Sequence, residues 1–270
     1  SHVGRLRHTS ADMRAQAIHA LAKAAGPAGA FLPKSGDWPS TIVKVFTERI
    51  LKDTVAEVRL DALHALVEAC PPGDPEAVKT CAAALKDAHR DVRHAAVIGM
   101  PKLASSGDER AIFSVAERLE DSDHKVRKSV SAVLSKLSTE HDRRLVQQVV
   151  LRLSSIHAVV RKVAVLTLVT VAPKGTQEVV AGIEGCLKDQ DSQVRIAAMK
   201  VLPSQVSLGQ EPCTTLVLEL LRDPSADVRT AAADCLSEIS IPRDKRVIAS
   251  LSELTGDSST DLYGHSLVPL

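Results

Sequence analysis

The sequence predicts an all-α fold, an α-solenoid in which antiparallel helix pairs stack as a superhelix with a 34-residue period. Three observations support this prediction. A Val-Arg pair recurs at constant spacing, each pair lies on an amphipathic stretch, and only 2% of the 270 residues are aromatic while 44% are hydrophobic. Small and branched aliphatic side chains fill the space between closely spaced helices without large rings.

The second helix of each repeat is recognised by a recurring arginine. These residues are Arg59, Arg93, Arg127, Arg161, Arg195 and Arg229, each 34 positions after the last. Valine precedes every one, alanine or valine follows three positions later, and leucine or methionine follows seven positions later. Offsets of −1, +3 and +7 fall on one face of a helix, so each arginine belongs to an amphipathic helix.

The first helix of each repeat ends at a leucine eight positions before the arginine, for example Leu85 or Leu153. A short polar turn follows, with aspartate six positions before five of the arginines and Ser155 as the exception. Such side chains can cap the second helix and favour its positive end. A helix pair of this size cannot bury its apolar face alone, so neighbouring pairs must stack into one core.

We expect one domain over residues 1–270. It comprises a partial repeat at 1–25, an inserted loop at 26–39, repeats at about 40–73, 74–107, 108–141, 142–175, 176–209 and 210–241, and a partial repeat at 242–270. The insertion places the early signature Met13-Arg14 45 residues before Arg59 instead of 34. Both ends cut through a repeat, and solenoids usually end in polar caps, so we expect a longer parent protein.

The aspartate turn, the Val-Arg pair and the following alanine and leucine resemble the HEAT repeat family, especially its short subclass found in phycobilin lyases. The resemblance covers about residues 40–240. It implies a scaffold whose second helices line a concave face. A 34-residue period also suits tetratricopeptide repeats, but their Trp, Gly-Tyr and Phe pattern is missing.

The net charge, the apolar runs and the cysteine content limit which classes of protein and which compartments the sequence fits. A net charge of +1 with intermixed acids and bases disfavours a nucleic-acid-binding protein. No apolar run approaches the ~20 residues of a membrane span. The five cysteines are widely spaced and odd in number, which predicts buried free thiols. A reducing, intracellular and cytoplasmic location is therefore expected.

Motifs of catalysis are missing. The sequence has no phosphate-binding Gly-rich loop, no His-Glu-x-x-His and no Gly-x-Ser-x-Gly, so we predict no enzyme, no cofactor and no catalytic or metal-binding residues. Deoxyhypusine hydroxylase is similar in architecture but uses His-Glu dipeptides, and none occurs here. His89, His124 and His157 recur at nearly equivalent turn positions, but helix layers ~8 to 10 Å apart are too distant to share one ion.

Two sets of residues are predicted to contact a partner. Phe31 and Trp38 bring two of the few aromatic residues into the inserted loop. His94, Lys128 and Lys162, together with Lys102 and Lys136, form a modest basic stripe on the second helices. Such a stripe suits an acidic protein segment or a nucleic-acid backbone.

The recurring arginines themselves are predicted to form a structural ladder, pairing with a turn aspartate of their own or of an adjacent unit. Pro101 and Pro203, eight positions after their repeat's arginine, are expected to bend or end their helices.

The function that we predict is a protein interaction scaffold or adaptor, which binds a partner protein or extended peptide within a larger assembly. One alternative is a bilin lyase or isomerase of the HEAT-like type, which would carry pigment. Another is a solenoid that binds the nucleic-acid backbone, which would retain DNA in a salt-sensitive manner.

Overall fold

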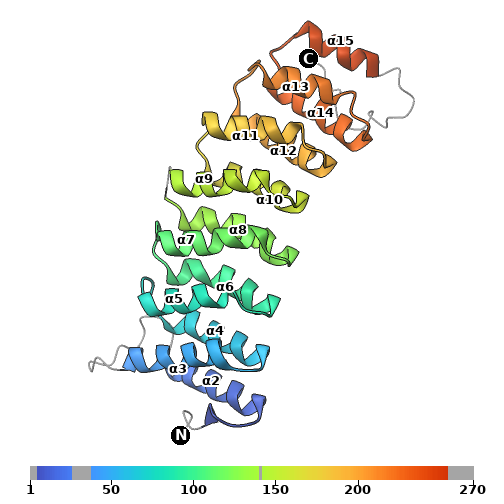
Figure 1. Ribbon diagram of the computed structural model, residues 1–270. Coiled ribbons are helices and arrows are strands. Elements are labelled where there is room, and N and C mark those ends of the chain that lie inside the picture. Colours follow the sequence, from blue (N-terminus) through green and yellow to red (C-terminus); the bar gives the residue numbers. More distant parts are fainter. Residues whose placement is uncertain (1–4, 26–37, 140–141, 255–270) are drawn as a thin grey trace. The chain divides into compact units, whose positions relative to one another are not determined.

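The computed structural model describes residues 5–25, 38–139 and 142–254, and within these ranges every regular element is a helix (Figure 1). The chain divides into two compact units, Ser1–Thr139 (unit 1) and Glu140–Leu270 (unit 2). The prediction of an all-α repeat fold is confirmed, whereas a single domain over the whole chain stays a prediction.

Unit 1 is a stack of helix pairs. Its helices are α2 (Ala11–Ala25), α3 (Trp38–Lys52), α4 (Ala56–Ala69), α5 (Pro75–Ala84), α6 (Arg90–Leu103), α7 (Glu109–Ala116), the 3₁₀ helix η1 (Glu117–Glu120) and α8 (His124–Leu137). The second helices α2, α4, α6 and α8 pack in sequence as one layer, and α3, α5 and α7 form the other (Figure 1). Each first helix also packs on its own second helix, so the apolar faces of both layers meet in a continuous core.

Unit 2 repeats the same plan. Its helices are α9 (Arg143–Leu151), the 3₁₀ helix η2 (Arg152–Ser154), α10 (Ala158–Val171), α11 (Gln177–Leu187), α12 (Ser192–Gln205), α13 (Cys213–Leu220), α14 (Ala226–Ile239) and α15 (Lys245–Leu254). The second helices α10, α12 and α14 pack side by side. The first helices α9, α11 and α13 each pack against the second helix of their own repeat.

The residues that define the repeat in the sequence are the core of both units. The aliphatic residues seven positions after each arginine are all 0% exposed: Leu66, Met100, Leu134, Leu168, Leu202 and Leu236. The residues three positions after each arginine are also 0% exposed: Ala62, Ala96, Val130, Ala164, Ala198 and Ala232. A small side chain at this level lets neighbouring helices approach closely, and a larger one in the next turn fills the space behind it.

Two predicted details differ in the structure. Trp38 and Pro39 begin helix α3 instead of lying in a loop, and a proline at the start of a helix loses no hydrogen bond because its N–H would be unpaired there. Pro101 and Pro203 lie inside α6 and α12, which continue to Leu103 and Gln205. Because each proline is in the last turn, the helix ends two residues beyond it and not at it.

Glycines in the turns between repeats connect each of these repeats to the next one in the same unit. The N–H groups of Gly73, Gly107 and Gly209 donate to the carbonyls of Leu103 (2.6 Å), Leu137 (2.7 Å) and Ile239 (2.7 Å), which end the second helices of the following repeats. These bonds satisfy carbonyls that a helix end leaves without an internal partner. All three glycines have positive φ, which a side chain would strain.

Two Gly→Ala changes in unit 2 are expected to have opposite effects on the free energy of unfolding. Gly209 has φ +71°, and an added Cβ would lie 2.7 Å from Ile241 Cγ2, so Gly209→Ala should cost about 1 to 2 kcal/mol. Gly185 is in helix α11 with open space around an added Cβ, so Gly185→Ala should add about 0.5 to 1 kcal/mol. Urea unfolding measures both, and changes of the same sign would contradict the argument.

The cysteines behave as buried aliphatic residues. All five are buried and free. Burial raises the pKa of the Cys70, Cys81, Cys213 and Cys235 thiols to about 12 and that of Cys186 to about 11, because an apolar environment disfavours the thiolate. The prediction of buried free thiols is confirmed.

Candidate interaction surface

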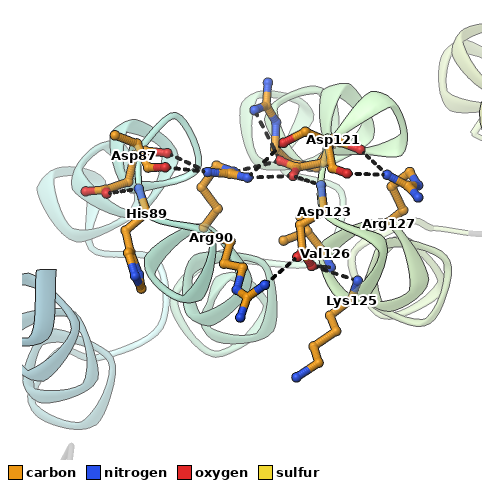
Figure 2. A network of polar contacts seen from close by, with 12 residues as sticks. Asp87, His89, Arg90, Asp121, Asp123, Lys125, Val126 and Arg127 are labelled. Carbon is orange, nitrogen blue, oxygen red and sulfur yellow. Dashed lines mark hydrogen bonds and ion pairs between the residues drawn. The ribbon is translucent and has the colours of Figure 1, made fainter.

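The recurring arginine joins two repeats. Arg93 Nη1 donates to the carbonyls of Asp87 (2.9 Å) and Ala88 (3.0 Å) in the turn of its own repeat. Arg93 Nε and Nη2 donate to the Asp121 carboxylate of the next repeat at 2.9 and 2.8 Å, and Figure 2 shows Asp87 and Asp121 on either side of this network. Both alternatives from the sequence therefore contribute: the arginine's own turn supplies carbonyls, and the adjacent turn supplies the carboxylate.

The same pairing recurs through the described helices. The pairs separated by 28 positions are Arg59–Asp87, Arg93–Asp121, Arg161–Asp189 and Arg195–Asp223. Arg14 pairs with Asp53, 39 positions later, because the eleven inserted residues add to the same offset of 28. The insertion therefore leaves the ladder intact.

Two arginines have carbonyl contacts without a carboxylate pair among the described residues. Arg127 Nη1 donates to the carbonyls of Asp121 and Ser122 (Figure 2), and Arg229 Nη1 donates to those of Asp223 and Pro224. The residue 28 positions after Arg127 is Ser155, which has no carboxylate. The residue 28 positions after Arg229 is Asp257, which lies outside the described part of the chain.

The carboxylate of each paired aspartate also accepts a hydrogen bond from the backbone N–H two residues later in its own turn. Asp121 Oδ1 accepts a hydrogen bond from the N–H of Asp123 at 2.9 Å, and Asp87 Oδ1 accepts one from His89 at 2.8 Å (Figure 2). Burial alone raises the pKa of the Asp121 carboxyl, but the hydrogen bonds from Arg93 and from the Asp123 N–H outweigh it, so the net pKa is lowered. The pKa of Asp87 is lowered in the same way by Arg59 and the His89 N–H.

Acid is expected to destabilise this ladder. A carboxyl whose folded-state pKa lies below its unfolded value of about 3.9 contributes stability above that value and loses it as the pH falls through the folded pKa. The free energy of unfolding of unit 1 should therefore fall steeply below about pH 4. Chemical denaturation across the acid range measures the slope. The double variant Arg93→Met/Asp121→Leu, which lacks one such carboxyl, should show a shallower slope, and an equal slope would contradict the assignment.

The predicted partner-binding residues of the basic stripe lie on second helices of both units. In unit 1, His94 Nε2 lies 2.9 Å from Ser129 Oγ, and Lys102, Lys128 and Lys136 are exposed. Lys162 belongs to unit 2, where its Nζ donates to Gln193 Oε1 at 3.0 Å. Phe31 and the side chain of Trp38 lie outside the described residues, so contacts of these aromatics stay a prediction.

A shallow groove between α4 and α6 was not anticipated from the sequence. Its volume is about 430 Å³, and it is lined by Leu60, His64, Val67, Glu68, Asp91, His94, Ala95, Ile98, Gly99 and Lys102. Ile98 is 49% exposed in this groove. Gly99 permits the close approach of the two helices, because an added Cβ would lie only 2.7 Å from Val67 Cγ2. An isoleucine five positions after an arginine, where α4 has histidine, is the sequence signal that could have revealed it.

We call the exposed side of α4, α6 and α8 the second-helix face. It comprises residues at offsets −2, +1, +2, +5 and +9 from each arginine, and eight of the ten residues that line the groove are at these offsets, all except Val67 and Gly99. The ladder arginines do not contribute to it, because the side chains of Arg59 and Arg93 donate to carbonyls in the turns between the helices. The face therefore consists of residues that the stacking of the repeats does not require.

The described ranges contain neither a metal-binding cluster nor a membrane-spanning helix. In residues 5–25, 38–139 and 142–254, no three histidine, cysteine, aspartate or glutamate side chains converge as ligands for a metal ion. None of the helices described above combines the length and the apolar character that crossing a membrane requires.

The comparisons with known proteins agree with this architecture. The HEAT repeats family matches residues 43–136 and 180–266, which is more than half of the chain, and the chain therefore belongs to the HEAT repeat family. No curated protein matches the sequence.

Among solved structures, the chain is similar to the Escherichia coli protein YibA, with 16% sequence identity, a TM-score of 0.52, and coverage of 85% of this chain and 84% of that one. An engineered protein also matches, with 19% identity, a TM-score of 0.44, and coverage of 94% and 71%. At this level of identity the likeness to YibA concerns the fold alone.

Proposed function

We propose that this HEAT repeat protein is an interaction scaffold, which binds a segment of a partner protein on its second-helix face as part of a larger assembly. The observation that carries the proposal is the groove between α4 and α6, where the exposed Ile98 lies among charged residues. An apolar side chain with a polar rim is the usual arrangement of a protein-binding surface. Packed helices hold the groove, so a partner meets a preformed surface.

The composition of the groove favours this function over the enzymatic alternative. A bilin pocket would have to enclose a large conjugated ligand, whereas this groove is shallow and has no Phe, Tyr or Trp among its lining residues. A nucleic-acid backbone would require one sign of charge along the face, but Glu68 and Asp91 lie beside Lys102. The buried free thiols support a reducing intracellular compartment.

Site-specific crosslinking tests the proposal. A photoreactive amino acid is introduced at Ile98 in the groove, or at Lys79 on α5 as the control, because the Lys79 side chain is 75% exposed on a first helix. Each protein is irradiated in native cell extract, and the crosslinked partners are identified by mass spectrometry. We expect a stoichiometric protein partner from position 98 that is absent from position 79.

Charge reversal completes this test. Lys128→Glu should weaken the crosslink from position 98, because Lys128 is exposed on the same face of unit 1. Lys162→Glu, in unit 2, tests whether the partner also contacts Lys162. Equal crosslinking from positions 98 and 79, a chain that purifies with a bound pigment, or one retained on DNA in a salt-sensitive manner would each overturn the proposal.

A further inference from the structure

The charges on the second-helix face of unit 1 change from acidic on α4 to basic on α8. Among the Asp, Glu, Lys and Arg residues of this face, those on α4 are all acidic, namely Glu57, Asp61 and Glu68. Those on α8 are all basic, namely Lys125, Lys128 and Lys136. Helix α6 lies between them and has one of each, Asp91 and Lys102.

These residues occupy equivalent places in successive repeats. Glu57, Asp91 and Lys125 are each 34 positions apart and lie two residues before the ladder arginine. Glu68, Lys102 and Lys136 are likewise 34 positions apart, nine residues after it. Since equivalent positions of stacked repeats point to the same side, both rows cross the face from an acidic end on α4 to a basic end on α8.

Local ion pairs do not explain this order. In the described part of unit 1, the lysine ion pairs are those of Lys79 and Lys86, and Lys125, Lys128 and Lys136 form none, although all three are exposed. On α4, Asp61 Oδ2 lies 3.4 Å from Nε2 of His19, a side chain that is 68% exposed. The stacking of the helices is already secured by the buried Arg–Asp ladder, so the exposed charges are available to a ligand.

The apolar groove lies toward the acidic end of the face, because it is formed by α4 and α6 and not by α8. A ligand that fills it with an aliphatic side chain would meet Glu68 on one side and the lysines of α8 on the other. The face therefore offers three features in a fixed order: acidic residues, an apolar groove and basic residues.

We propose that the second-helix face of unit 1 binds an extended peptide of matching charge order, with basic residues over α4, one aliphatic side chain in the groove and acidic residues over α8. This proposal rests on the proposed scaffold function and specifies the chemistry of the partner. Charge complementarity of this kind sets the register and orientation of a bound segment. A nucleic acid offers a single sign of charge and cannot satisfy both ends.

The spacing of the helices sets the spacing of the peptide motif. Neighbouring helices lie roughly 8 to 10 Å apart, and an extended chain advances about 3.3 Å per residue. The basic and acidic groups should therefore be separated by about five to six residues, with the aliphatic residue about two from the basic group. The sequence Lys-Lys-Ser-Leu-Ser-Ser-Ser-Glu-Glu, with acetylated and amidated ends, has this pattern.

Fluorescence anisotropy at low ionic strength compares this peptide with two controls on the whole chain. In the controls, both charged ends are lysine or both are glutamate, while the leucine is kept. The peptide with matching charge order should bind about tenfold more tightly than either control, because several exposed charge contacts together reach that size. Equal binding of the three peptides, or tightest binding of either control, would overturn the proposal.

Charge reversal on the protein provides a gain of binding that a folding defect cannot imitate. In the variant Lys125→Glu/Lys128→Glu/Lys136→Glu, the peptide with lysine at both ends should become the tightest ligand. Ile98→Glu should weaken binding of the matching peptide, whereas Ile248→Glu, at a residue 46% exposed in unit 2, should leave it unchanged. Competition by single-stranded DNA as effective as that by the unlabelled matching peptide would contradict the proposal.

The two proposals fail in different ways. A crosslink from position 98 without any preference for charge order would refute only the peptide chemistry. If position 98 gives no specific crosslink, the scaffold function fails, whatever the synthetic peptides do.

Discussion

Asp121→Ala is expected to lower the free energy of unfolding of unit 1 by about 3 to 5 kcal/mol. The Asp121 side chain is 1% exposed and accepts two hydrogen bonds from Arg93, whose own side chain is only 10% exposed. Removing the carboxylate leaves a guanidinium with little access to water and without its partner, which is the costly way to break a buried ion pair. It also removes the cap on the Asp123 N–H.

Hydrogen exchange of the amides of α6 and α8 measures this loss, because a repeat stack distributes its stability and can open locally. Asp108→Ala is the matched control: Asp108 caps α7 through the Ala111 N–H at 3.0 Å and is not in the ladder, so about 1 kcal/mol is expected. The double variant Arg93→Met/Asp121→Leu should recover much of the stability, since apolar side chains can replace a buried ion pair. If the single variant is no less stable than Asp108→Ala, the ladder does not hold the repeats together.

Leu168→Ala is expected to destabilise unit 2 by about 2 to 5 kcal/mol. Leu168 is 0% exposed on α10, at the position seven residues after Arg161 where every repeat has leucine or methionine. Its loss removes apolar contacts and leaves a cavity that rigid neighbouring helices can fill only in part. Urea unfolding of the whole chain measures the change.

Leu166→Ala provides the same substitution two residues away on the same helix. Leu166 is 40% exposed, so the change should be below about 1 kcal/mol. Similar losses at the two positions would mean that the offset of seven does not mark the core.

The residues that hold the repeats together are different from the residues that can bind a partner. The arginine and aspartate side chains recur in nearly every repeat and turn into the polar turns between helices. The second-helix face varies instead, with Glu57, Asp91 and Lys125 at one equivalent position. Substitutions on this face are therefore expected to alter binding with little effect on folding, whereas substitutions in the ladder affect folding first.

The sequence by itself determined the repeat and its core. The Val-Arg pair at 34-residue spacing identified the second helices, and the offsets of +3 and +7 identified Ala96 and Met100 as buried residues, which the structure confirms. This was decidable because apolar periodicity along a helix is a local property, and its repetition removes the ambiguity of any one segment.

The tertiary structure alone decided which groups meet. Either of two aspartates could have paired with each arginine, and only the stacking shows that Arg93 reaches Asp121 of the next repeat while it contacts the Asp87 carbonyl of its own. The groove likewise depends on the approach of α4 to α6 at Gly99; the sequence marks Ile98 as unusual at its offset but does not show that the two helices approach closely beside it. Contacts between residues far apart in the chain depend on the distance and rotation between packed helices, and these follow from how side chains of the whole layer interlock.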